Sequence, residues 1–138
     1  MMNILISGAG IAGPALAYWL GAAGHDVTVV SQEPNPDEVD IGTARTVRPE
    51  LPGGLLPVFV LDRYEGLSPK YLQDFTEDEK RAYVDANASV LRALLPADLI
   101  FTNHVLMGGP VGAATGEPFR VKAHGSELEY SMRGRPEL

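Results

Sequence analysis

The chain has 138 residues, 45% of them hydrophobic, and a formal net charge of -7 at pH 7, which fits one globular domain. It contains no cysteine, which excludes disulfide frameworks, thiolate metal sites and cysteine nucleophiles. No apolar run approaches the ~20 residues that cross a bilayer, and the negative charge disfavours binding to nucleic-acid phosphates. The start, Met-Met-Asn before an apolar run, is unlike a secretory signal. We therefore predict a cytoplasmic protein that enters no membrane and binds no nucleic acid.

Apolar runs alternate with helical segments along the chain. We predict strands at residues 3–7, 27–30, 43–48, 56–61, 99–102 and 119–123, and helices at 14–23, at 77–95 and from 126 onward. Thr76 with Glu79, and Ser126 with Glu129, have the spacing of a capping box. Strands that are apolar on successive residues indicate a parallel sheet covered on both faces. The predicted fold is therefore α/β, with a Rossmann-like, doubly wound, mainly parallel sheet and helices on both faces.

Ligands of doubly wound sheets bind outside the carboxyl ends of the strands, so the residues that follow the predicted strands are the functional candidates. These residues lie far apart in the sequence but share one edge of the predicted sheet. They are residues 8–13, Asp62 with Arg63, Asn103 with His104, and residues 124–129.

Gly8, Gly10 and Gly13 form the pattern G-x-G-x-x-G between a predicted strand and a predicted helix, which is the context this pattern requires. Glycine lets the backbone turn tightly and approach a pyrophosphate, whose charge then faces the free N–H groups of the helix N-terminus. We therefore predict that the three glycines bind a dinucleotide cofactor, FAD or NAD. The alternative is a glycine-rich turn kept for close packing of the strand against the helix.

Residues 3–17 read NILISGAGIAGPALA. This stretch closely resembles the amino terminus of FAD-dependent aromatic-hydroxylase-type monooxygenases, and the resemblance implies FAD binding at the glycines. In that family the second strand usually ends on an acidic residue for the adenosine ribose. Here Ser31 and Gln32 follow the strand, and Glu33 is displaced.

The rest of the chain carries four separated motifs: GHDVTVV at 24–30, LPVFVLDRYEG at 56–66, TNH at 102–104 with GGP at 108–110, and KAHGSELEY at 122–130. Together they resemble the amino-terminal domain of retaining GT-B-fold glycosyltransferases, a family with glycogen-synthase-like and sucrose-synthase-like members. The resemblance implies a domain that binds the acceptor, with the nucleotide sugar held by a second, donor domain that this sequence lacks. We interpret residues 1–23 as flavoprotein-like and residues 24–138 as glycosyltransferase-like parts of one domain, joined between residues 17 and 24.

Two histidines end predicted strands close to glycines. By the glycosyltransferase resemblance His124 lies near the transferred sugar as the catalytic candidate, and His104, Gly125, Ser126 and Glu127 are candidates for substrate binding. The alternatives are hydrogen-bonded structural histidines and, for Glu127, an interaction with the positive end of a helix dipole. No short His-to-His spacing preorganises a metal site, so we predict none.

Three functional hypotheses remain. The first is an isolated or chimeric acceptor-side domain of a GT-B glycosyltransferase, without transfer activity alone. The second is a minimal dinucleotide-binding domain of the oxidoreductase type, and the third is a chimeric scaffold with no selected function. A domain separated from its partner domain exposes the former contact surface, which a homodimer would cover.

Overall fold

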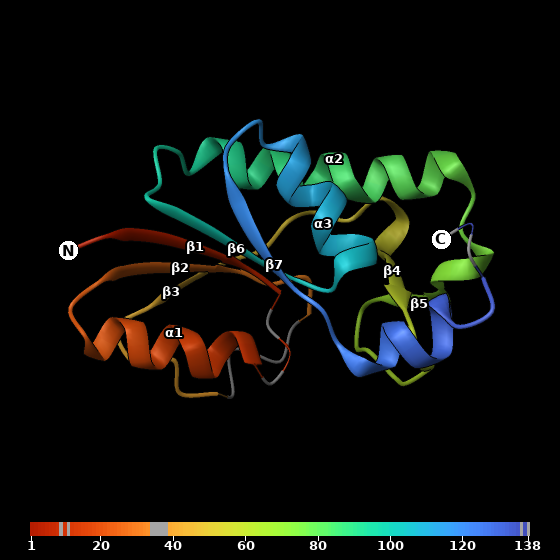
Figure 1. Cartoon of the computed structure of the whole chain (residues 1–138), viewed down its shortest axis with the longest axis horizontal. Helices are drawn as coiled ribbons and strands as arrows, with labels where there is room; N and C mark the ends of the chain where they lie inside the picture. The colour runs from red at the N-terminus through yellow and green to blue at the C-terminus, as the bar shows by residue number, and fades with distance from the viewer. Residues whose placement is uncertain (9, 11, 34–38, 136, 138) are drawn as a thin grey trace.

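A computed structural model describes residues 1–8, 10, 12–33, 39–135 and 137. Five strands form one parallel sheet in the order β3-β2-β1-β6-β7 (Figure 1). The elements, in chain order, are β1 (Asn3–Ser7), α1 (Ala12–Ala22), β2 (Asp26–Val30), β3 (Arg45–Val47), β4 (Leu55–Val58), β5 (Ser68–Tyr71), α2 (Glu77–Ala93), β6 (Leu99–Asn103), α3 (Val105–Ala114), β7 (Phe119–Lys122) and the π-helical turn η4 (Glu127–Met132). The predicted α/β fold with a parallel sheet is confirmed.

Helices cover both faces of this sheet, as the sequence predicts. α1 lies on one face, and α2 and α3 lie on the other (Figure 1). Side chains of β1 alternate between the two layers: Ile4 and Ile6 pack into the cluster on the α1 side, whereas Leu5 packs into the cluster with Leu91 of α2 and Val111 of α3. All five side chains are almost completely buried. The continuous apolar character of β1 therefore reflects burial on two sides.

The predicted strand at residues 56–61 is shorter than expected and lies outside the main sheet. β4 ends at Val58 and pairs in parallel with β5, a strand that the sequence analysis missed. Val60 and Leu61 are 57% and 51% exposed, so the apolar run continues into a surface loop. Asp62 and Arg63 follow in that loop, which corrects their predicted position at the edge of the main sheet. β4, β5 and η4 lie beside the C-terminal ends of the main strands (Figure 1).

α2 begins at the predicted capping box. The N–H of Glu79 donates to the Thr76 hydroxyl (3.2 Å), and the Thr76 N–H donates to the Glu79 carboxylate (2.7 Å). These two bonds satisfy two N–H groups that the first helical turn leaves free. Among the described helices, none has the length and hydropathy that crossing a bilayer requires.

The second predicted capping box is wrong. Ser126 already has helical backbone angles and makes no capping bond with its side chain, and the Glu129 carboxylate pairs with Arg133 instead (2.8 Å). The capping contact lies two residues before the predicted one, at His124, whose backbone N–H donates to the carboxylate of Glu127 (3.0 Å). This is the acidic half of a capping box, shifted by two residues.

Candidate functional site

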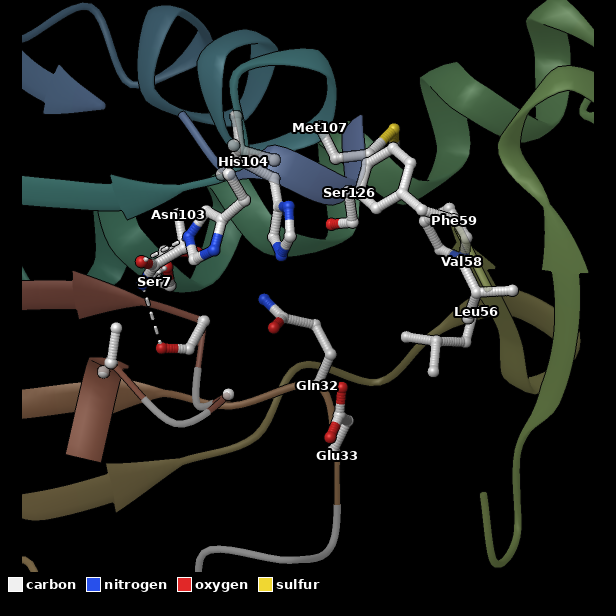
Figure 2. Close-up of a pocket in the computed structure, with 18 of the residues that line it drawn as sticks. Ser7, Gln32, Glu33, Leu56, Val58, Phe59, Asn103, His104, Met107 and Ser126 are labelled. Carbon is white, nitrogen blue, oxygen red and sulfur yellow. Dashed lines mark hydrogen bonds between the residues drawn. The ribbon is translucent and has the colours of Figure 1, made fainter. Parts of the chain in front are cut away.

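A cavity of about 260 Å³ opens at the C-terminal ends of β1 and β6 (Figure 2). The chain runs outward from β1 to β3 on one side, and β6 and β7 lie on the other. The cavity therefore occupies the point where the strand order reverses, which is the usual ligand position in this architecture. The side chains of Leu56, Val58 and Phe59 form an apolar wall opposite the ends of the main strands (Figure 2).

Most of the predicted site residues come together here. The cavity is lined by eight of them, namely Gly8, Gly10, Ala12, Gly13, Asn103, His104, His124 and Ser126. Gly125 and Glu127 do not line it. Asp62 and Arg63, in the exposed loop after β4, do not line it either.

The glycine loop has a different requirement at each glycine. Gly8 has φ +106°, a conformation that favours glycine, and its N–H donates to the carbonyl of Val30 (2.9 Å). A Cβ on Gly13 would lie 2.1 Å from the Gly8 carbonyl oxygen, whereas a Cβ on Gly10 would meet nothing within 4 Å. Backbone conformation thus explains Gly8 and packing explains Gly13, whereas packing does not explain Gly10. Residues 9 and 11 of the motif lie outside the described residues.

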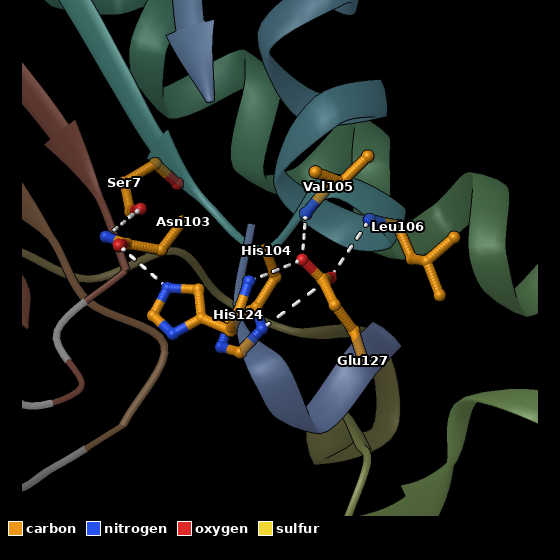
Figure 3. Close-up of polar contacts among 7 residues, drawn as sticks. All are labelled: Ser7, Asn103, His104, Val105, Leu106, His124 and Glu127. Carbon is orange, nitrogen blue, oxygen red and sulfur yellow. Dashed lines mark hydrogen bonds and ion pairs between the residues drawn. The ribbon is translucent and has the colours of Figure 1, made fainter. Parts of the chain in front are cut away.

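Asn103 connects the glycine loop to the histidines (Figure 3). Its side-chain Nδ2 donates to the carbonyls of Ser7 and Gly8, each at 3.3 Å. Its Oδ1 lies 3.2 Å from Nε2 of His124. One buried amide therefore joins the ends of β1 and β6 to the residue that follows β7.

His104 sits at the junction of β6 and α3 with φ +65°, which is uncommon for a residue other than glycine. Its ring stacks on His124, with centroids 4.1 Å apart, and contacts Phe59 at 4.9 Å. Burial lowers the pKa of His104 to about 4; His124 adds to this effect and Glu127 opposes it. The ring is therefore neutral at pH 7. Its Nδ1 is buried without a hydrogen-bond partner in the described structure, 3.7 Å from the Glu127 carboxylate.

Glu127 is completely buried and its carboxylate faces backbone donors (Figure 3). It accepts from the N–H groups of Val105 (2.8 Å) and Leu106 (3.2 Å), as well as from His124. Negative charge is stabilising at a helix N-terminus. The structure therefore favours the alternative in which Glu127 interacts with the positive end of a helix dipole. The helix is α3 and not the one predicted to begin at residue 126.

The sequence analysis did not select Gln32 or Glu33, which line the cavity from the end of β2 (Figure 2). The Ser31 hydroxyl donates to the carbonyl of Glu33 (2.8 Å) and so shapes this turn. Glu33 is half-buried, and burial raises the pKa of its carboxyl. The available signal was its position just after a buried strand, the same signal that identified the histidines.

Comparisons with known proteins give several short likenesses in sequence, two of which show their extent. No family model matches the chain. The chain is 47% identical over 49 residues to a D-amino acid dehydrogenase of Bradyrhizobium diazoefficiens, and 54% identical over 33 residues to the FAD-dependent monooxygenase asL4 of Sarocladium schorii. These matches cover 35% and 24% of this chain, but only 12% and 8% of the two relatives. The chain thus spans about a tenth of the length of the curated relatives it matches.

The structural comparison extends over nearly the whole chain. CalG4, the calicheamicin glycosyltransferase, aligns with a TM-score of 0.53 and 22% identity over 99% of this chain and 36% of CalG4. The chain therefore shares its Rossmann-like fold with part of a glycosyltransferase and resembles flavin enzymes over short stretches. Both resemblances expected from the sequence are found.

Proposed function

We propose that the chain is the acceptor-side domain of a GT-B-type glycosyltransferase and that its cavity binds a neutral, hydroxyl-bearing acceptor. The composition of the cavity carries this proposal. An apolar wall with a small number of placed polar groups is typical of small-molecule sites, and here the polar groups include the side chains of Asn103, His104, His124 and Gln32.

The charges around the cavity support a neutral ligand. None of the described residues that line it is Lys or Arg, the residues that most often pair with phosphate. Glu33 adds an acidic group, and His104 is neutral at pH 7 because burial lowers its pKa. A hydroxyl group therefore fits these surroundings better than a phosphate group.

Transfer would need a second domain. In a GT-B enzyme the reaction takes place in a cleft between two domains, and this chain would supply one wall, with the nucleotide sugar held by the other. We therefore propose that the chain binds acceptor without transferring sugar alone. The proposal includes a chimeric origin, with the flavoprotein-like part joined to the glycosyltransferase-like part between residues 17 and 24.

The glycine loop favours dinucleotide binding as a second candidate function. Gly10 is exposed just before α1 and its space is not needed for packing, as expected where backbone approaches a pyrophosphate. The cavity of about 260 Å³ is below the ~300–1,000 Å³ of sites that enclose drug-sized ligands. A dinucleotide would therefore extend beyond the cavity along the loop.

Thermal unfolding with added ligand separates the two candidates, because a ligand that binds only the folded state raises its stability by ~2.7 kcal/mol at 100 times its Kd. The ligands are methyl α-D-glucoside, UDP-glucose, GDP-mannose, FAD and NAD. The acceptor-side proposal expects a saturable rise with the glucoside that His124→Ala reduces more than Gly10→Val does. The second candidate expects a rise with FAD or NAD and the opposite order of the two variants.

Two matched variants control for general effects of the substitutions. A Cβ on Gly109 meets nothing within 4 Å, as at Gly10, but Gly109 does not line the cavity. His25 lies away from the cavity, where its Nδ1 accepts from the N–H of Met2 (3.2 Å). Gly109→Val and His25→Ala should leave every ligand response unchanged. No response to any ligand in the wild-type protein would contradict both candidates and leave the scaffold hypothesis.

A further inference from the structure

The orientation of the Asn103 amide is determined by its surroundings. Two backbone carbonyls, those of Ser7 and Gly8, lie at hydrogen-bond distance from one end of the amide. Carbonyls only accept, so this end must be the NH₂ group. The opposite orientation would place three acceptor oxygens together inside a buried site. The Oδ1 atom therefore faces His124.

This orientation fixes the proton on the His124 ring. Oδ1 of Asn103 carries no proton, so the contact of 3.2 Å with Nε2 is a hydrogen bond only when Nε2 carries the hydrogen. In the neutral ring Nδ1 then has a free lone pair. No described residue forms a hydrogen bond with Nδ1 of His124, and the ring lines the cavity. Nδ1 is the ring atom left for a ligand.

We propose that Asn103 is a positioning residue that holds His124 as the Nε2–H tautomer, so that Nδ1 accepts a hydrogen bond from a hydroxyl group of the bound ligand. This inference rests on the proposed function and narrows it. The neutral ring offers an acceptor to the cavity, which matches a hydroxyl donor and opposes a phosphate oxygen, since phosphate oxygens also accept. The imidazole thus favours a hydroxyl-bearing ligand, as does the absence of Lys and Arg from the described residues that line the cavity.

Other groups around His124 are consistent with this role. The titratable groups that face it are the stacked ring of His104, the carboxylate of Glu127, which binds the His124 backbone N–H, and Glu33 on the cavity wall. None of these groups forms a hydrogen bond with a His124 ring nitrogen, whereas Asn103 does, so among the described residues Asn103 is the group that decides the tautomer. Gly8 leaves room for the amide, because a Cβ on Gly8 would lie 3.1 Å from Cβ of Asn103.

The experiment is a long-range ¹H–¹⁵N NMR spectrum of the histidine side chains in the free protein at pH 8, where the two neutral tautomers give distinct patterns. Wild-type His124 should show the Nε2–H pattern. Asn103→Leu, which has a similar volume but neither donor nor acceptor, should give a mixture of tautomers. Asn103→Asp keeps an acceptor for Nε2–H and should keep the Nε2–H pattern, but it loses the NH₂ group that donates to Ser7 and Gly8 and should therefore unfold at a lower temperature than the wild type. His25, the histidine outside the cavity, serves as the internal control and should not change.

A wild-type Nδ1–H pattern, or an unchanged His124 pattern in a folded Asn103→Leu variant, would overturn the inference. Titration with methyl α-D-glucoside provides the ligand readout. The His124 Nδ1 resonance should move on binding, and Asn103→Leu should weaken binding about two- to tenfold, the effect of one hydrogen bond. A correct tautomer with no glucoside response contradicts the proposed function but not the positioning role, so the two failures are distinguishable.

Discussion

Replacing Glu127 by Gln tests whether its buried carboxylate stabilises the start of α3. One carboxylate oxygen accepts from Val105 and His124, and the other accepts from Leu106. Gln keeps one acceptor but places an NH₂ group against a backbone N–H. A hydrogen bond to a charged group contributes ~1.5–3 kcal/mol, and the charge at a helix N-terminus contributes up to ~2 kcal/mol in a partly buried position.

We therefore expect Glu127→Gln to lower the free energy of unfolding by about 2–4 kcal/mol, or Tm by roughly 8–16 °C at about 4 °C for each kcal/mol. Urea unfolding followed by circular dichroism measures this change. Glu129→Gln is the matched control in the same turn, because its exposed ion pair with Arg133 contributes only ~0–1 kcal/mol. Equal stability of the two variants would refute the capping role of Glu127.

Three further predictions concern stability. Gly13→Ala should cost about 1–3 kcal/mol, because its Cβ would lie 2.1 Å from the Gly8 oxygen, whereas Gly10→Ala should stay within about 0.5 kcal/mol of wild type; denaturant melts compare them. Below pH 6.5 the unfolded chain protonates His104, but the folded protein does so only near its pKa of about 4. Stability should therefore fall as the pH is lowered through this window, and less steeply in His104→Asn. Thr76→Ala should cost about 1 kcal/mol by removing the cap of α2, and an unchanged melting temperature would contradict this.

The sequence predicted the elements whose patterns are local. β1, α1 and β2 were placed within two residues, because apolar strands buried on both faces flank a glycine turn. The apolar run after β4 misled the prediction, since a continuous run does not show which sheet a strand joins. β7 was also expected from an apolar run, yet it is the edge strand, and Val121 is 37% exposed. Which sheet a strand joins depends on its pairing with strands far away in the sequence, and the local pattern of apolar residues does not show that pairing.

The candidate site was predicted only in part, because some of its residues have local signals and others depend on distant partners. Glycines and histidines at strand ends are recognisable one at a time, and parallel topology then brings them to one edge. The role of Asn103 depends on carbonyls of Ser7 and Gly8, more than ninety residues away in the sequence. The role of Glu127 depends on the start of α3. Both are side chains whose partners are fixed only by the tertiary structure.

The central position of β1 has a consequence for the order in which the chain folds. Ile4 pairs with Val27 on one side and with Leu99 on the other. During synthesis β2 can therefore pair with β1 early, but the second edge of β1 stays open until β6 has emerged. An open apolar strand edge is a template for association with other chains. We expect the closure of this edge to be the slow step in folding, because it joins the most distant segments of the sheet.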